Sequence, residues 1–301
     1  MFHVKQKTMK KIENCPNCNS KNYSSLINCK DHTVTKETFT IVKCADCKLA
    51  FTNPRPKESD LGKYYESEEY ISHSNNTEGW FNFLYQRARS INIKSKLQTI
   101  GKPKGNLLEI GSGTGELLKA CKNEGWNITG IEPNNTAREN AKKNHNLDLI
   151  ESLDNVSLEN KSQDVIMMWH VLEHVPNLKE TTLKLNSLLK DNGKLIIAVP
   201  NHKSYDAAYY KESWAAYDVP RHLLHFNKET MALSLKSAGF EIIKTKPMWL
   251  DSIYVSMLSE KIMSGNKNPT RAIMIGLISN LKALIKTKEY SSIIYIAKKT
   301  F

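Results

Sequence analysis

The sequence predicts an α/β fold built on a doubly wound, largely parallel sheet that follows a small cysteine-rich module. Three observations support this prediction. Short apolar runs alternate with helix-like segments over residues 105–247, glycines at 111, 113 and 115 follow the first of these runs, and two Cys-x-x-C pairs lie within the first 60 residues. A glycine turn between a buried strand and a helix is where such sheets bind nucleosides. The sequence therefore predicts a nucleoside-binding α/β domain with a separate N-terminal module.

Length and charge limit the function classes. With 301 residues the chain can bury a full α/β core and carry a small module. Its net charge of +12 is concentrated in residues 1–60 and 251–301. A solvated surface accounts for such lysine richness, and an acidic partner (nucleotide-sugar phosphate, anionic lipid or nucleic acid) is the alternative. Residues 1–11 contain no signal-peptide core and the apolar run 272–278 is too short to cross a bilayer, so we expect a cytoplasmic protein with reduced thiols.

The first 58 residues contain two cysteine knuckles. Because each knuckle directs two thiolates toward one point, the pairs together predict a closed tetrahedral Zn(II) site. Its four expected ligands are Cys15, Cys18, Cys44 and Cys47. Residues 38–42 and 49–52 are expected to form strands beside the second knuckle, which gives a zinc ribbon over residues 1–58. Cys29 has no partner at knuckle spacing and is expected to be a spare thiol, and Cys121 is expected in a helix core.

Residues 59–103 are expected to link the ribbon to the α/β domain. Residues 60–65 are expected to be helical, and residues 80–100 show apolar side chains at helical spacing. Glycines and a proline in residues 101–105 indicate a hinge into the first strand. The domain boundary is therefore expected near residue 104.

The glycine turn distinguishes between cofactors. A strand at 107–110, a helix at 116–123 and a strand at 128–131 surround it, and Glu132 ends the second strand, where it can accept hydrogen bonds from ribose hydroxyls. Dinucleotide folds read G-x-G-x-x-G and place pyrophosphate on the helix N-terminus. Here the pattern is E-x-G-x-G-x-G, and the carboxylate of Glu109 would repel pyrophosphate but suits a ligand with an amino group. NAD binding is the alternative.

This pattern resembles motif I of the class I S-adenosylmethionine-dependent methyltransferases. The resemblance implies a Rossmann-like seven-stranded sheet in residues 104–301, S-adenosylmethionine as cofactor, and a lid over the cofactor formed by residues 59–103. Tyr64, Tyr65 and Tyr70 could line the pocket beneath that lid, and packing against the sheet is equally open for each. The resemblance implies eleven cofactor-binding residues, namely Glu109, Gly111, Ser112, Gly113, Gly115, Glu132, Pro133, Ser152, Leu153, His170 and Val171.

The remaining segments continue the alternation. Helices are expected at 135–144 and 183–189, and strands at 147–150, 164–169, 194–199 and 240–247, with a turn at 191–193 and a final antiparallel strand at 291–298. The leader from C-P-x-C to C-x-x-C-K-L-A-F-T-N-P-R-P is similar to the ribbon of a bacterial methyltransferase group that includes sugar C-methyltransferases. The resemblance therefore extends over both parts of the chain.

A long insertion at about 250–288 precedes the last strand. One helical face of it is apolar and comprises Met274, Leu277, Ile278, Leu281, Leu284 and Ile285, with lysines elsewhere. We expect this face to pack on the fold or on a second copy in a homodimer. Peripheral contact with an anionic membrane through residues 272–288 is the alternative.

Histidines gather where an acceptor is expected to bind. The chain has no N/D-P-P-Y/F clamp after residue 169 and no cysteine beyond Cys121, which disfavours methylation of exocyclic base amines and of cytosine C5. An imidazole titrates near neutrality and suits a base for hydroxyl or carbon acids. His222 and His225, then His174, are the candidate bases, and structural hydrogen bonding is equally open for each. Arg221 is expected to bind a carboxylate or phosphate, with Tyr217 and Trp214 beside it.

These observations favour a small-molecule methyltransferase that acts on carbon or oxygen of a sugar or glycan precursor. A quinone-precursor or other lipid methyltransferase at a membrane surface is one alternative. An RNA-modifying enzyme that grips RNA with its ribbon is another, but residues 1–60 lack the basic and aromatic interleaving of nucleic-acid stacking surfaces. A catalytically silent cofactor-binding protein is disfavoured because the cofactor motifs are intact.

Overall fold

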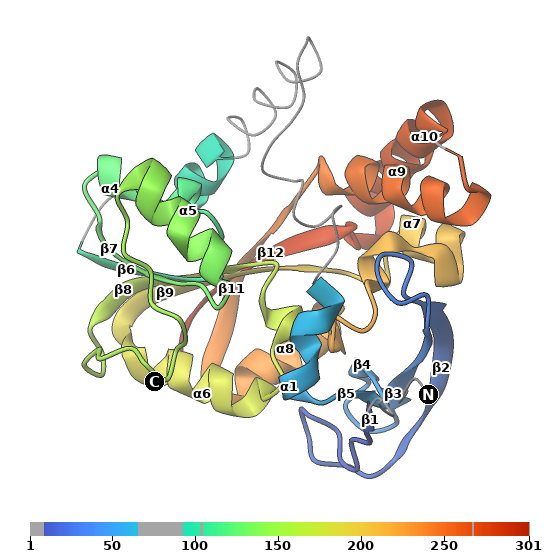
Figure 1. Cartoon of the computed structure of the whole chain (residues 1–301), viewed down its shortest axis with the longest axis horizontal. Helices are drawn as coiled ribbons and strands as arrows, with labels where there is room; N and C mark the ends of the chain where they lie inside the picture. Colours follow the sequence, from blue (N-terminus) through green and yellow to red (C-terminus); the bar gives the residue numbers. More distant parts are fainter. Residues whose placement is uncertain (1–8, 66–92, 103–104, 267, 301) are drawn as a thin grey trace, which may run out of the picture.

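The computed structural model describes residues 9–65, 93–102, 105–266 and 268–300. A six-stranded sheet with the order β11-β12-β9-β8-β6-β7 forms its centre (Figure 1). The strands are β6 (Asn106–Ile110), β7 (Asn127–Ile131), β8 (Gln163–Trp169), β9 (Leu189–Pro200), β11 (Phe240–Pro247) and β12 (Ser292–Lys299). β12 pairs antiparallel with both neighbours, whereas β7, β6, β8 and β9 are mutually parallel. The expected doubly wound α/β sheet with an antiparallel closing strand is confirmed.

The expected strand at 147–150 is reduced to a single parallel bridge between Ile150 and Ile131. It occupies the position of a seventh strand beside β7. The backbone nitrogen of Glu132 donates to the Ile150 carbonyl, and the nitrogen of Ile150 donates to Gly130. Two hydrogen bonds hold the segment against the sheet edge, and they suffice to position the loop that follows.

Helices cover both faces of the sheet because its strands are apolar on both sides. The helices are α4 (Glu116–Asn123), α5 (Asn135–His145), α6 (Leu178–Leu188) and α8 (Lys228–Ser237). One core joins α4 and α5 to alternate strand residues such as Leu107 and Met167, and Cys121 is buried there as expected. The other core joins α6 and α8 to the intervening residues, such as Leu108 and Met168. Strand alternation therefore produces a three-layer arrangement.

The predicted turn at 191–193 lies inside β9. Pairing between β8 and β9 jumps from Gln163–Leu189 to Val165–Lys194, so residues 190–193 bulge out of the ladder. The bulge replaces the separate turn that the Asp-Asn-Gly tripeptide had suggested, since Leu189 is buried and paired before it.

The cysteine module forms a small antiparallel sheet that the α/β domain completes. Its strands are β1 (Met9–Lys10), β2 (Tyr23–Lys30), β3 (Thr38–Cys44), β4 (Ala50–Thr52) and β5 (Arg55–Pro56). β10 (Leu224–His225), from the α/β domain, pairs with β4. Phe51 and Val42 share a core with β6, α6 and α8, and Phe39 and the buried Cys29 share another with α7 (Tyr205–Tyr210). The module is therefore an integral part of the fold.

Short helices connect these parts. They are α1 (Glu58–Leu61), a 3₁₀ turn at Gly62–Tyr65, a helical segment over 93–100, and further 3₁₀ turns at Leu172–His174, Lys211–Ser213 and Ala215–Tyr217. The helix expected over 80–100 lies within the described residues only from 93 onward, and Tyr70 lies outside them. Most of the expected lid therefore falls outside the described residues.

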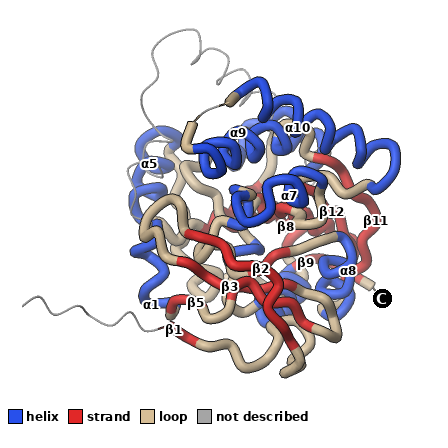
Figure 2. Tube along the Cα trace, turned by 90° about the vertical axis from the view of Figure 1, so that its right-hand side faces the viewer, coloured by secondary structure: helices blue, strands red, loops and turns tan. Residues whose placement is uncertain are grey.

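The insertion before β12 is a helical pair, α9 (Asp251–Ser264) and α10 (Pro269–Lys282), which continues as a π-helical turn over Ala283–Thr287. The pair packs on α7 (Tyr205–Tyr210), which lies between it and the ribbon (Figures 1 and 2). Gly276 allows the close crossing, because a Cβ there would lie 2.8 Å from the Ile253 backbone. None of the described helices is long and apolar enough to cross a membrane.

The apolar face predicted on this insertion is mostly exposed. Met274, Leu277, Leu281, Leu284 and Ile285 are between 48% and 73% exposed. α10 instead packs through its opposite face, where Ala272, Ile275 and Ser279 are buried. The expectation that the apolar face packs on the chain's own fold is therefore wrong for the described structure. The face that includes Gly276 packs on α9 instead, because it allows the two helices to approach more closely.

Candidate active site

The glycine turn follows β6 at the carboxyl edge of the sheet. Gly111, Gly113 and Gly115 have φ values of 74°, 55° and 84°, a region that favours glycine. At Gly111 an added Cβ would lie 2.3 Å from a methyl group of Val171, whereas at Gly113 it would meet nothing within 4 Å. The turn is thus closely packed behind its first glycine and open at its second. This leaves bare backbone available to a ligand.

Glu132 ends β7 beside this turn. One carboxylate oxygen accepts a hydrogen bond from the backbone nitrogen of Gly113 at 2.8 Å, and the other accepts from Asn134 at 2.9 Å. Arg138 donates to the carbonyl groups of Glu132 and Pro133. The acid is therefore fixed in position, and each oxygen retains lone pairs that ribose hydroxyls can use.

Glu109 is buried in β6 directly below the turn, and its Oε2 atom accepts no hydrogen bond. Burial raises the pKa of Glu109 to about 8, although the ammonium of Lys96 acts in the opposite direction. Lys96 itself lies with its Nζ 4.6 Å from the centroid of the Trp169 ring. A cationic ligand group beside Glu109 would satisfy this carboxylate, which is the environment expected for the amino group of the cofactor.

Of the other expected cofactor residues, Val171 packs over Gly111. Ser112 donates through its hydroxyl to the carbonyl of Glu109 at 3.2 Å, which closes the turn. Ser152 accepts a hydrogen bond from the backbone nitrogen of Asn155, and Leu153 packs against the core in the loop after Ile150. The structure places all of these at the carboxyl edge of the sheet, and their contact with a cofactor stays a prediction.

His170 follows β8 with a positive φ of 55°. Its Nδ1 lies 3.3 Å from a Glu173 oxygen and its Nε2 lies 3.2 Å from an Asp251 oxygen. Burial lowers the pKa of His170, but the two carboxylates have the larger, opposite effect and raise this pKa to about 10. His170 is therefore an imidazolium that joins the end of β8 to α9.

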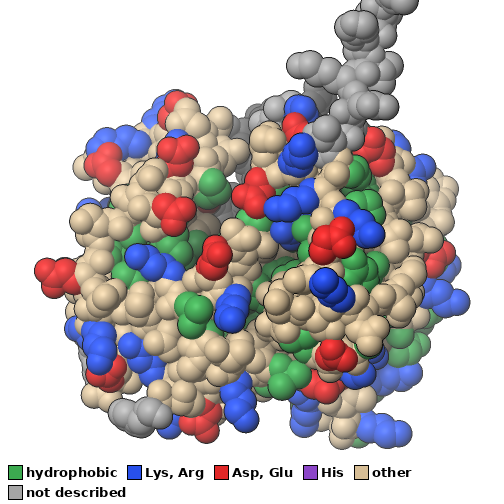
Figure 3. Space-filling model, turned by 90° about the horizontal axis from the view of Figure 1, so that it is seen from below, with side chains coloured by type: hydrophobic (Ala, Val, Ile, Leu, Met, Phe, Trp, Pro, Cys, Tyr) green, Lys and Arg blue, Asp and Glu red, His purple; other side chains and the backbone are tan. Residues whose placement is uncertain are grey.

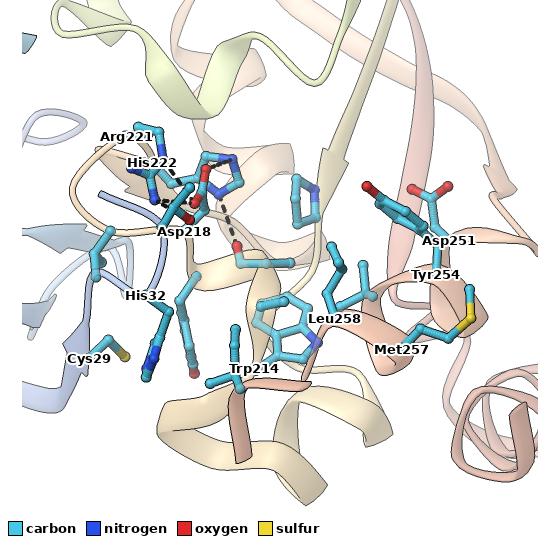
Figure 4. A pocket seen from close by; sticks show the side chains of 18 of the residues that line it. Cys29, His32, Trp214, Asp218, Arg221, His222, Asp251, Tyr254, Met257 and Leu258 are labelled. Atoms are coloured by element: carbon cyan, nitrogen blue, oxygen red, sulfur yellow. Dashed lines mark hydrogen bonds and ion pairs between the residues drawn. The ribbon is translucent and has the colours of Figure 1, made fainter. Parts of the chain in front are cut away.

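A cavity of about 1200 Å³ lies beyond His170 and Lys96. Three parts of the chain line it, and Figure 4 shows their side chains facing one another. The ribbon supplies Cys29, Lys30, His32, Thr33 and Lys36; the loop before β10 supplies Trp214, Tyr217, Asp218, Arg221 and His222; and α9 with the residues preceding it supplies Leu250, Asp251, Tyr254, Met257 and Leu258. The ribbon thus forms one wall of the candidate acceptor site.

His174 and His222 both line this cavity, and their ring centroids are 4.6 Å apart. His222 Nδ1 lies 2.9 Å from the Ala216 carbonyl, and His174 Nδ1 lies 3.0 Å from the Arg221 carbonyl and 3.1 Å from the Tyr65 hydroxyl. Because a carbonyl only accepts, each Nδ1 carries a hydrogen and donates it, and each Nε2 is the nitrogen that remains available to other groups. Burial, reinforced by His222, lowers the pKa of His174 to about 4.

The structure does not bring His225 into this group. Its ring lies between β4 and β10, with Nε2 3.0 Å from the Thr52 hydroxyl, and it is not among the residues that line the large cavity. Burial lowers the pKa of His225 well below its ordinary value. The expectation that His225 is a base is therefore corrected, because the pairing of β10 with β4 places its ring beside Thr52 in the ribbon interface.

Arg221 is also placed differently from the expectation. Its side chain is 1% exposed and donates to Asp218, to Asp31 and to the Tyr64 carbonyl. These bonds occupy the guanidinium within the protein, so we correct the expected role of binding a substrate anion. Arg221 instead ties together the ribbon at Asp31, the start of the expected lid at Tyr64 and the cavity loop at Asp218. Tyr217 and Trp214 line the cavity, and their contact with an acceptor stays a prediction; the Trp214 indole nitrogen donates to Asp206 at 2.8 Å.

The four knuckle cysteines converge on one point. The sulfur atoms of Cys15 and Cys47 are 3.4 Å apart, those of Cys18 and Cys44 are 3.6 Å apart, and all four lie within 4.8 Å of one another. Tetrahedral Zn(II) with bonds of about 2.3 Å requires sulfur atoms about 3.8 Å apart. The donor set and spacing therefore fit a closed zinc site about which the ribbon folds.

Several residues in and around the cavity were missed in the sequence. Glu173, which pairs with His170, was not among the expected site residues, and Asp251, the other partner of His170, lies 81 positions beyond it. Lys30, His32 and Lys36 come from a ribbon segment with no recognisable motif. Only Glu173, three residues after His170 and next to His174, had a local signal that could have revealed it.

The strand order, the acid-flanked glycine turn and the acid after the second strand define a class I, S-adenosylmethionine-dependent methyltransferase. A family model described as a methyltransferase domain matches residues 84–245, just over half of the chain. The chain therefore belongs to this methyltransferase family.

Relatives and solved structures agree with this assignment. A ubiquinone biosynthesis O-methyltransferase of Rickettsia typhi is 31% identical over 147 residues, which cover 44% of this chain and 58% of the relative. The corresponding protein of Rickettsia felis is 28% identical over 55% of this chain and 73% of the relative. The chain thus spans less than two thirds of the length of the first of these.

Two solved structures share the fold. Phosphoethanolamine N-methyltransferase 2 of Haemonchus contortus, in complex with S-adenosylmethionine, aligns with a TM-score of 0.53 at 16% identity over 93% of this chain and 69% of its own. Geranyl diphosphate C-methyltransferase of Streptomyces coelicolor A3(2), in complex with Mg²⁺, geranyl diphosphate and S-adenosylhomocysteine, aligns with a TM-score of 0.51 at 12% identity over 81% and 90%. At these identities the likeness concerns the fold alone.

Proposed function

We propose that this enzyme methylates an oxygen or carbon atom of a small anionic molecule, such as a sugar or glycan precursor, in the cavity between the ribbon, the 212–222 loop and α9. The observation that carries the proposal is the composition of the ribbon wall. Lys30, His32 and Lys36 lie together on it. Burial lowers the pKa of His32, and the positive charges of the two lysines lower it further. A cationic wall in a cavity that His174 and His222 also line suits an acceptor with a phosphate or carboxylate group.

The cofactor binds, on this proposal, at the glycine turn. Glu132 holds the ribose hydroxyls, Glu109 faces the amino group, and the remaining residues of the expected set complete the site. Methyl transfer is an in-line displacement at the sulfonium, so the protein mainly orients the acceptor and assists loss of its proton. We place that assistance at His222 and His174, because both side chains line the cavity and both rings are held through Nδ1. Zn(II) on the four cysteines holds the ribbon wall in place.

Labelled methyl transfer tests this proposal. Purified protein with labelled S-adenosylmethionine is screened against nucleotide sugars, quinols and RNA. We expect transfer to an anionic sugar derivative, and Lys30→Met with Lys36→Met should raise its KM about tenfold or more. Lys122→Met with Lys143→Met, on the exposed sides of α4 and α5, is the matched control that removes two charges elsewhere. Activity confined to RNA, or an unchanged KM in the ribbon variants, would contradict the proposal.

The two histidines are tested against His225. His222→Ala and His174→Ala should lower kcat at least about hundredfold, which is the usual contribution of a group that assists proton transfer. His225→Gln, which keeps a donor or acceptor for Thr52, should leave kcat within a few-fold. Cofactor affinity, measured by calorimetry, should be similar in all three. A loss confined to His225→Gln would reverse the assignment.

A second candidate is a lipophilic acceptor, such as a quinone precursor, taken up at a membrane surface. The supporting observation is α9, because its exposed Tyr254, Met257 and Leu258 also line the cavity, and the exposed face of α10 is next to it. Leu281→Glu with Ile285→Glu should then abolish flotation with anionic vesicles. If flotation is absent and native mass spectrometry finds dimers that the same substitutions dissociate, the face is a homodimer contact.

The RNA alternative has less support. It requires a stripe of positive charge along a groove. On the face shown in Figure 3, lysines and arginines are interspersed with acidic side chains. Such mixing is typical of a solvated surface.

A further inference from the structure

Glu173 is the least explained side chain of the cavity region. It is 1% exposed, and neither carboxylate oxygen accepts a hydrogen bond. His170, 3.3 Å away, is the cationic neighbour of one oxygen. The ion pair with His170 offsets part of the cost of burying this carboxylate, but neither oxygen has a hydrogen bond of ordinary geometry. A bound ion is one explanation for a buried polar group of this kind.

The neighbours of Glu173 are also typical of metal ligands. One ring nitrogen of His174, one of His222 and one oxygen of Glu173 all lie within 4.8 Å of one another. Each histidine donates its Nδ1 hydrogen to a backbone carbonyl, from Arg221 and Ala216 respectively. Metal-binding histidines characteristically donate their second nitrogen in this way, because it fixes the ring and leaves the other lone pair for the ion.

We propose that Glu173, His174 and His222 form a binding site for a divalent transition-metal ion, distinct from the cysteine site. Two imidazoles and one carboxylate suit Zn(II), Mn(II), Fe(II) or Co(II), and such a triad leaves coordination positions open. Both histidines line the cavity, so the open positions face the acceptor. Bonds of about 2.0–2.2 Å to one ion require ligand atoms about 3.0–3.5 Å apart, and these three lie within 4.8 Å of one another, so the side chains must rotate inward to bind it.

This inference rests on the proposed function and refines the role of the two histidines. With the ion present they are ligands, and an acceptor hydroxyl oxygen occupies an open position, where the positive charge lowers its pKa. The acceptor O–H bond breaks and its proton passes to Asp218, whose Oδ2 lies 4.0 Å from His222 Nε2. The oxygen then forms its bond to the methyl carbon while the carbon–sulfur bond of the sulfonium breaks, and S-adenosylhomocysteine leaves.

Cobalt titration of the zinc-loaded full-length protein tests the site without cofactor or acceptor. We expect one added Co(II) per chain, with visible absorption of a nitrogen and oxygen environment and without the near-ultraviolet charge-transfer band of cobalt thiolate. Glu173→Gln and His222→Ala should each weaken cobalt binding at least tenfold, and Glu173→Asp should restore part of it. His225→Gln removes a nearby histidine outside the cluster and should bind cobalt as the unchanged protein does.

Circular dichroism and thermal unfolding without cobalt show whether each variant folds. If Glu173→Gln does not fold, cobalt binding by His222→Ala and His174→Ala tests the metal site instead. Absence of cobalt uptake, uptake retained in both His222→Ala and Glu173→Gln, or a thiolate band that reports exchange at the cysteines would overturn the metal site. The proposed function fails separately. If the enzyme transfers methyl groups but takes up no added cobalt, only the metal site is wrong. If it takes up cobalt but methylates no anionic acceptor, only the proposed acceptor class is wrong.

Discussion

Glu109 allows a quantitative prediction about cofactor binding. Burial raises its pKa to about 8, so about nine tenths of the molecules carry a protonated Glu109 at pH 7 without ligand. The cationic amino group of S-adenosylhomocysteine beside this carboxylate favours the ionised form and lowers the pKa. Binding at pH 7 should therefore release about 0.9 proton from Glu109, and ionising it costs about 1.4 kcal/mol of the binding free energy.

Calorimetry in two buffers with different ionisation enthalpies measures this proton release directly. The affinity should rise about tenfold per pH unit below pH 8, where the free protein must lose the proton, and level off above pH 8. Glu109→Gln should bind about 10- to 100-fold more weakly at pH 8 because it lacks the charge-assisted contact. Ionisation of the ligand's own amino group contributes equally to both proteins, so the difference between them reports Glu109.

Equal proton release by the unchanged protein and Glu109→Gln would refute this reasoning. It would show either that Glu109 is already ionised in the free protein or that the amino group binds elsewhere. A control with Lys96→Met separates these explanations. Removal of the neighbouring ammonium should raise the pKa of Glu109 further and increase the proton release toward one.

Three further predictions concern the parts that hold the site. Gly111→Ala forces a methyl group toward Val171 at a positive φ, so it should lower the free energy of unfolding by about 1–3 kcal/mol and also weaken cofactor binding. Denaturant titration measures the loss of stability, and the double variant with Val171→Ala should regain part of it. No recovery in the double variant would mean that backbone strain alone is responsible. Arg221→Met leaves the buried Asp31 without its cation and should cost about 3–5 kcal/mol in the same assay, and a change below 1 kcal/mol would show that the backbone hydrogen bonds of Asp31 suffice. Cys44→Ser should remove the bound zinc, which native mass spectrometry measures. Because the ribbon forms a wall of the acceptor cavity, the KM for the acceptor should rise more than the Kd for the cofactor. An equal rise in both constants would mean that zinc supports the whole fold.

The cofactor side of the site could be predicted from the sequence because its interactions are local. The turn at 111–115 lies between adjacent elements, and its positive φ values require the glycines that the sequence shows. The helix expected at 116–123 has the same bounds in the structure. Each of these features depends on residues fewer than about 20 positions apart.

The acceptor side could not be predicted in the same way. His222 and His225 are three residues apart in one string, yet one lines the cavity and the other faces Thr52 in the ribbon interface. Their roles depend on the pairing of β10 with β4, a contact between segments about 170 residues apart. Nothing in the local spacing indicates that pairing.

The sequence by itself determined the sheet, the cofactor turn and the cysteine cluster, because periodic burial, positive φ and paired thiolates are imposed by neighbouring residues. Only the tertiary structure decided that the ribbon is a wall of the cavity and that Arg221, bonded to Asp31 across 190 positions, is a structural cation. It also decided that Glu173, His174 and His222 converge. The physical reason is that burial and pairing of charges depend on which distant segments share a core, and this follows from the packing of the whole chain.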